Sequence, residues 1–256
     1  MRFGYCADLK NAELVARLGF DYIECPAAAL SAMSDADFLA GMRTLRDTGL
    51  SCETTNLFLP KDISVYETDR ERVRSYFLHT FDRLGQLGVQ IAVFGSGGAR
   101  RVPIDLSMRD AQARFIEFTR LAAELALPYG ITIALEPLNF RETNFMLTEA
   151  DALELVQRIE LANVGLILDL FHYAFELKPM DSISAYKDTL CHLHLAEPFT
   201  RKIPRKGDYD YAPLFAALKS MDYAGRASIE AGPPDEDQLR EALAVLQAAH
   251  AHAACL

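Results

Sequence analysis

The sequence contains few cysteines, and no two of them stand at metal-binding or redox spacing. Among its 256 residues there is no C-x-x-C motif, and the five cysteines are Cys6, Cys25, Cys52, Cys191 and Cys255. An odd number of scattered cysteines is typical of a reducing compartment and argues against a disulfide framework. The first four lie in apolar, strand-like stretches, so we interpret them as core residues rather than as catalytic thiols.

Long hydrophobic runs and an excess of positive charge are also absent. No apolar run reaches membrane-spanning length, and the chain begins with a strand-like stretch rather than a secretory signal. We therefore expect a cytoplasmic protein with no membrane partner. The formal net charge of −10 disfavours a nucleic-acid partner, because binding a phosphate backbone usually needs a basic face. No linker interrupts the chain, so we expect one domain over residues 1–256.

Short apolar segments alternate with helical patterns along the whole chain. Half of the residues are hydrophobic, which is enough for a large core. The predicted strands cover residues 2–8, 21–26, 51–56, 91–97, 132–139, 164–172, 190–198 and 226–232. Several are almost continuously apolar, as expected for strands buried on both faces of a parallel sheet. Eight such units predict an α/β fold, a single (β/α)8 TIM barrel, with an open doubly wound sheet as the alternative.

Charged or imidazole side chains stand near the ends of four consecutive predicted strands. The carboxyl ends of barrel strands face the active site, and acidic groups that converge there would repel one another unless a cation held them. A set of two Glu, one Asp and one His favours Mn²⁺, with Mg²⁺, Co²⁺ or Zn²⁺ as alternatives. His192 points the same way as His194 and is a second candidate for the imidazole ligand. The predicted site for one divalent ion consists of Glu136, Asp169, His194 and Glu230.

Motifs at these strand ends resemble the xylose-isomerase-like barrel superfamily, in particular its sugar isomerase and ketose 3-epimerase branch. The resemblance covers essentially the whole chain and rests on Glu136-Pro-Leu-Asn139, Leu168-Asp169-Leu-Phe-His172, and His192-Leu-His194 trailed by Arg201. It implies that the same four residues bind the metal. It further implies that Glu136 and Glu230 are the catalytic acid/base pair. The residues that it implies for sugar binding are Glu142, His172 and Arg201.

One departure from the family pattern concerns the arginine. Arg201 follows His194 by seven residues, whereas the related epimerases have six. Arg205 is therefore a rival for contact with the sugar.

The resemblance implies an isomerase or epimerase that acts on a sugar or sugar phosphate. Such a reaction removes a proton from a carbon beside a carbonyl or hydroxyl group, and a chelated cation would stabilise the resulting enediolate. Two carboxylates that approach from across the barrel mouth could exchange protons with the two faces of the substrate. A homo-oligomer is compatible with the sequence.

Three other functions remain as alternatives. An inosose-type dehydratase would use the same metal site to expel a hydroxyl group. An apurinic endonuclease is disfavoured by the net negative charge. The resemblance also implies additional metal-binding histidines at the ends of the second and third strands of such enzymes, where this chain has Glu24, Glu53 and Asn56. A non-catalytic sugar-binding barrel would not need the complete ligand set.

The loops near the predicted site carry opposite charges. Residues 231–237 are acidic and lack a glycine-rich cradle, which argues against the phosphate site that many barrels form there. The loop after residues 190–198 is basic, which leaves a phosphorylated or acidic sugar open. We interpret the glycine-rich residues 95–98 as a tight turn, and Arg100 and Arg101 as surface or loop anchors.

Overall fold

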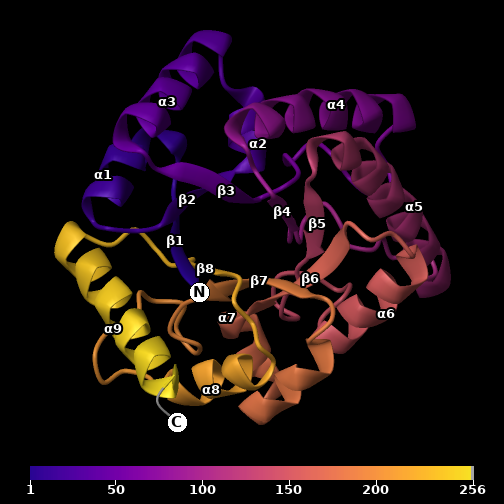
Figure 1. Cartoon of the computed structure of the whole chain (residues 1–256). Coiled ribbons are helices and arrows are strands. Elements are labelled where there is room, and N and C mark those ends of the chain that lie inside the picture. The colour runs from indigo at the N-terminus through magenta and orange to yellow at the C-terminus, as the bar shows by residue number, and fades with distance from the viewer. Residues whose placement is uncertain (255–256) are drawn as a thin grey trace.

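Eight parallel strands close into a barrel, with helices around its outside (Figure 1). The computed structural model describes residues 1–254. Strands pair in chain order, and β1 pairs with β8 to close the sheet. The predicted (β/α)8 barrel is confirmed, and the open doubly wound sheet is wrong. The strands are β1 (Arg2–Cys6), β2 (Tyr22–Pro26), β3 (Ser51–Asn56), β4 (Ile91–Phe94), β5 (Thr132–Leu135), β6 (Val164–Asp169), β7 (Leu190–Leu195) and β8 (Arg226–Ile229).

Most of the predicted strands extend too far at their carboxyl ends. β5 stops at Leu135 and β8 at Ile229, one residue before Glu136 and Glu230 respectively. The apolar pattern cannot show this boundary, because the first loop residues remain buried in the barrel mouth. The pairing of strands ends where the candidate site begins.

Four of the longer helices begin at residues whose side chains accept hydrogen bonds from exposed backbone N–H groups. Ser34, Asp69, Ser107 and Thr148 each cap a helix in this way, which satisfies donors that the helix itself leaves free. The helices are α1 (Ala12–Arg17), α2 (Ala27–Ala32), α3 (Asp35–Thr48), α4 (Arg70–Leu87), α5 (Met108–Ala126), α6 (Glu149–Ile159), α7 (Leu170–Tyr173), α8 (Ala212–Ser220) and α9 (Glu236–Ala254).

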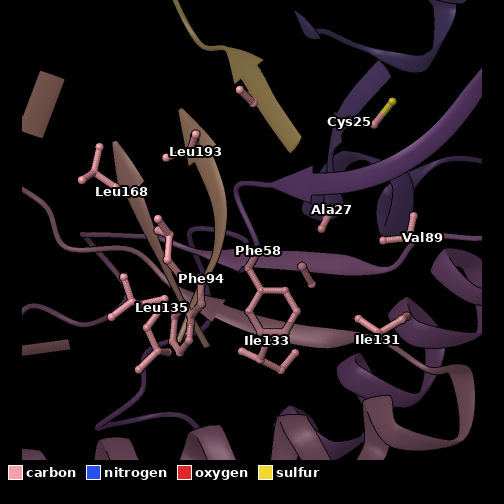
Figure 2. Close-up of a cluster of buried hydrophobic side chains, with 14 of the residues drawn as sticks. Cys25, Ala27, Phe58, Val89, Phe94, Ile131, Ile133, Leu135, Leu168 and Leu193 are labelled. Atoms are coloured by element: carbon pink, nitrogen blue, oxygen red, sulfur yellow. The ribbon is translucent and has the colours of Figure 1, made fainter. Parts of the chain in front are cut away.

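The main core fills the space between the barrel and the helices. Figure 2 shows part of it, with Phe58 and Phe94 close to Ile133 of β5. Phe58 stacks on Phe77 of α4 with 5.3 Å between ring centroids, and Phe94 stacks on Phe115 of α5 at 5.2 Å. Burial of these aromatic rings holds α4 and α5 against the sheet.

The cysteines occupy places close to those predicted. Cys25 and Cys52 are fully buried, whereas Cys6 and Cys191 are partly buried, and all four are free thiols. Cys255 lies outside the described residues. In the described part of the chain, no helix combines the length and the hydrophobicity that crossing a bilayer requires.

A smaller apolar cluster lies inside the barrel. It consists of Ile91, Val93, Ala134 and Ile167, from β4, β5 and β6. Side chains alternate between the two faces of a strand, so Glu136 and Asp169, two residues beyond Ala134 and Ile167, also point inward. The register of the strands thus fixes which polar residues reach the barrel mouth.

Candidate active site

The four residues predicted to bind metal meet at the carboxyl end of the barrel. Glu136 follows β5, Asp169 ends β6, His194 lies in β7 and Glu230 follows β8. Each offers a ligand atom, and these atoms all lie within 4.8 Å of one another. The structure therefore brings together the complete set named from the sequence.

His194 stands between carboxylates on both sides of its ring. Its Nδ1 lies 3.2 Å from Oε1 of Glu136 and 3.3 Å from Oε2 of Glu230. Its Nε2–H donates to Oε1 of Glu24 at 2.9 Å. Burial alone would lower the pKa of His194, but Glu230 and Glu24 hold it well above its usual value. Nδ1 is thus the atom that faces the cluster, and Glu24 fixes the orientation of the ring.

Glu24 lies beneath the cluster and is fully buried. Its Oε2 accepts hydrogen bonds from His192 Nε2 at 2.8 Å, from Thr54 Oγ1 at 2.7 Å and from Ser228 Oγ at 2.5 Å. Glu24, His192 and His194 are close enough to hold an ion by distance alone, but these bonds already satisfy the carboxylate. His192, the second candidate from the sequence, therefore lies one layer deeper than the cluster.

Asp169 is the least compensated member of the cluster. Its Oδ2 is buried and has no hydrogen-bond partner among the described residues. Burial, opposed by Arg201 and reinforced by Glu230 and Glu136, raises the pKa of Asp169 to about 7. A divalent cation would stabilise this arrangement in two ways. It would be bound by the oxygen that has no hydrogen-bond partner, and its charge would offset the repulsion among the carboxylates. The donor set therefore fits a metal ion.

Arg201 links the cluster to the loop after β7. Its Nη2 donates to Glu230 Oε2 at 2.6 Å and its Nη1 to Glu142 Oε1 at 3.1 Å. Its guanidinium lies over the ring of Phe171, 4.9 Å from the centroid. Its backbone has a φ of 54°, a left-handed conformation that costs energy in a residue other than glycine and is often found at functional sites.

His172 lies beside Asp169 and is almost fully buried. Its Nδ1 accepts from the backbone N–H of Asn139 at 3.2 Å, and its Nε2 lies 3.5 Å from Asp169 Oδ2. Burial, together with Arg201, lowers the pKa of His172 to about 3. The ring is therefore neutral, with Nε2–H directed toward the cluster.

The three residues predicted to contact sugar thus lie together around the cluster, whereas their rival Arg205 makes no contact with the cluster residues that the structure describes. Glu142, His172 and Arg201 are within 4.0 Å of one another in pairs. Arg205 is half exposed and faces Glu241 at 4.0 Å. The extra residue in the spacing between His194 and Arg201 does not remove Arg201 from the site.

Sequence reasoning missed two supporting contacts. Asn56 Nδ2 donates to Glu230 Oε1 at 2.9 Å. Arg100 is fully buried, and its Nη2 donates to the main-chain oxygen of Glu136 at 2.6 Å. Burial lowers the pKa of Arg100 to about 10. Arg100 is therefore not a surface residue, but it does anchor the loop after β5 through Glu136, and Arg101 anchors the same loop through the main-chain oxygen of Glu142.

The glycine-rich segment after β4 is a turn packed against the site. Ala99 N–H donates to Ser96 O at 2.9 Å, which closes the turn predicted for residues 95–98. A Cβ atom on Gly95 would lie 2.0 Å from Oε2 of Glu136. Glycine at this position therefore leaves the space that the carboxylate of Glu136 occupies.

Known proteins are similar to this chain in sequence and in fold. Residues 12–249 match the sequence model of the family described as xylose isomerase-like TIM barrel. The chain belongs to this family. The resemblance inferred from the motifs is confirmed.

Named relatives in the xylose isomerase-like family include epimerases and isomerases. The chain is 28% identical over 228 residues to D-psicose 3-epimerase of Agrobacterium fabrum, which covers 85% of this chain and 77% of that protein. It is 28% identical over 249 residues to 2-oxo-tetronate isomerase of Haemophilus influenzae, 92% of each chain. A crystal structure of D-psicose 3-epimerase in the presence of D-fructose shares the fold, with a TM-score of 0.86, 22% identity, and coverage of 98% of this chain and 99% of that chain. These relatives support the prediction of an isomerase enzyme over the dehydratase alternative.

Proposed function

We propose that this chain is a metal-dependent sugar isomerase or epimerase that moves protons with two carboxylates. The observation that carries the proposal is the group of four ligand atoms within 4.8 Å of one another, contributed by the carboxyl ends of β5 to β8. Its relatives add the substrate class, because they include enzymes named for psicose and for 2-oxo-tetronate.

Glu136, Asp169, His194 and Glu230 would hold the ion, and their oxygen-rich set favours Mn²⁺ over softer metals. When bound, a divalent ion polarises the carbonyl and adjacent hydroxyl oxygens of the sugar. Glu24 would keep Nδ1 of His194 directed at the ion, because its carboxylate accepts a hydrogen bond from the Nε2–H group of His194. Hydrogen bonding of this kind sets both the tautomer and the basicity of a ligand histidine.

Glu136 and Glu230 are suited to act on opposite faces of a sugar carbon. They follow β5 and β8, with β6 and β7 between them, and an oxygen of each lies within 3.3 Å of Nδ1 of His194. His194 and Arg201 hold the pKa of Glu230 far below its usual range despite burial, so this carboxylate is ionised and can accept a proton. One carboxylate would take the proton from one face of the carbon and keep it, while the other, in its protonated form, would donate its own proton to the opposite face, which inverts the carbon.

Each carboxylate is held in place by a neighbour outside the cluster. Asn56 donates to Oε1 of Glu230, and Arg100 donates to the main-chain oxygen of Glu136. Glu142, His172 and Arg201 would contact the hydroxyl groups of the sugar. Arg201 pairs with three carboxylates, those of Glu142, Asp169 and Glu230, and a bound sugar would take over part of these contacts.

The test is turnover of ketoses and aldoses in deuterated water with Mn²⁺, followed by NMR. We expect deuterium to enter the substrate carbon, because a proton on a carboxylate exchanges with solvent before it returns. An isomerase that transfers hydride would retain the original hydrogen, and a dehydratase would yield a product short of one water. Full retention of hydrogen during turnover would contradict the proposal.

Glu142→Ala and His172→Ala separate sugar contacts from metal ligands. We expect both variants to lose turnover while their Mn²⁺ content, measured on the purified proteins, stays at one ion per chain. Loss of Mn²⁺ in either variant would make that residue a ligand.

A further inference from the structure

A cavity of about 410 Å³ lies between the loop after β7 and the loop after β8. This volume is within the range of roughly 300–1,000 Å³ typical of small-molecule sites. Residues 200–203, Arg205, residues 232–234 and Gln238 form its walls. The cavity therefore opens at the same end of the barrel as the candidate active site.

The lining of this cavity is positively charged in a protein of net charge −10. It includes Arg201, Lys202 and Arg205, and no acidic residue. Within residues 1–254 the ammonium of Lys202 makes no ion pair, and Arg205 reaches only Glu241, at 4.0 Å. Two cations at the cavity are thus largely uncompensated, as expected where an anion binds.

The acidic residues of the loop after β8 do not line the cavity. Asp235 accepts from the backbone N–H of Gln238 at 2.8 Å at the start of α9. Glu236 pairs with Arg17 and Asp237 with Arg240, each at 2.7 Å. These acidic residues were one reason to disfavour a phosphate site here, and the structure directs each of them to a partner outside the cavity.

Arg201 connects the cavity to the four-residue cluster. It lines the cavity, and its Nη2 lies 2.6 Å from Oε2 of Glu230. The cavity is therefore one arginine side chain away from the carboxylate that would move the proton.

We propose that the cavity binds an anionic terminal group, a phosphate or a carboxylate, on the ketose that this enzyme converts. The inference rests on the proposed function and adds the substrate class to it. Lys202 and Arg205 would donate charge-assisted hydrogen bonds to the anion, and these are stronger than bonds between neutral groups. Arg201 would lie between the anion and the reacting carbons.

The experiment compares three substrates on the Mn²⁺-loaded enzyme: a ketose, its terminal phosphate ester, and the corresponding keto acid. We expect kcat/KM to be at least about 10-fold higher for one anionic form than for the neutral ketose, since hydrogen bonds to charged groups contribute that much each. The preferred form identifies the anion as phosphate or carboxylate.

Variants locate the preference in the cavity. Lys202→Ala and Arg205→Ala should each lower the ratio of anionic to neutral kcat/KM by about 10- to 100-fold. Lys206→Ala is the matched control, because Lys206 lies in the same loop outside the lining, and it should keep the wild-type ratio.

Two results would overturn the inference and leave the proposed function intact. One is neutral ketose converted as well as both anionic forms, and the other is a preference that survives Lys202→Ala and Arg205→Ala. Failure to convert any of the three substrates, together with a wider sugar panel, would instead remove the proposed function.

Discussion

The two ends of the barrel treat buried carboxylates in opposite ways. At the amino end, Glu53 accepts from Arg2 and Arg226, each at 2.5 Å, and from Ser51 at 2.7 Å. At the carboxyl end, three carboxylates crowd around His194 and Arg201, and an oxygen of Asp169 has no hydrogen-bond partner among the described residues. A balanced charge network holds strands together, whereas an unbalanced one is available to bind a cation and a substrate.

The largest expected effect comes from removing a proposed base at the carboxyl end. Glu136→Gln and Glu230→Gln keep the shape of the site but should each lower kcat by about 10²- to 10⁴-fold at saturating Mn²⁺, as loss of a general base does. Rates near wild type in either variant would contradict the assigned role. The two variants should also differ in which epimer still exchanges deuterium.

A smaller effect is expected one layer below the cluster. Glu24→Gln should weaken Mn²⁺ binding by about 10- to 100-fold, because His194 loses the carboxylate that orients it. Calorimetric titration of the apo protein measures this affinity without any turnover. Thermal unfolding without metal provides the control for folding, and an unchanged affinity in a folded variant would show that Glu24 is only structural.

The pH dependence of metal binding follows from the unbalanced charges. In the absence of metal, Asp169, with a pKa of about 7, and His194, with a raised pKa, hold protons near neutrality. Metal ligands must lose these protons. The affinity for Mn²⁺ should therefore fall as the pH decreases from about 8 to about 6, by up to about 10-fold per pH unit for each displaced proton, and the proton on Asp169 contributes below about pH 7. Proton release measured in two buffers of different ionisation enthalpy checks the sign, and equal affinity at both pH values would refute it.

A Glu→Gln substitution at the amino end of the barrel should leave the candidate active site unchanged. Glu53→Gln removes a carboxylate that two arginines share, and it should lower the free energy of unfolding by about 1–3 kcal/mol. Urea unfolding measures this loss, while Mn²⁺ affinity and kcat should match the wild type. A change in kcat would mean that the two ends are not independent.

The sequence was sufficient for the barrel and for the cluster because both depend on local patterns. Apolar runs predicted the strands. A charged residue directly after such a run, as at Glu136 and Glu230, predicted which residues lie at the carboxyl end of the barrel. The partners of these residues could not be read in the same way. The contact between Glu24 and His192 joins residues 168 positions apart across the barrel, and no periodicity predicts it.

Loop residues were the hardest to interpret, because their direction depends on packing rather than on pattern. Arg100 is in an irregular segment, and its charge suggested exposure, yet the structure buries it behind Glu136. The acidic residues after β8 were grouped by position, although each points to a different partner.

The close approach of Glu136 to Gly95 has a consequence for the comparison of family members. A single methyl group there would meet Oε2 of Glu136 at 2.0 Å and force the carboxylate to rotate away. A homologue could thus retain all four metal ligands and still be inactive, because a residue larger than glycine at position 95 displaces one of them. The residue at position 95 therefore helps to distinguish active from inactive homologues, independently of the ligands themselves.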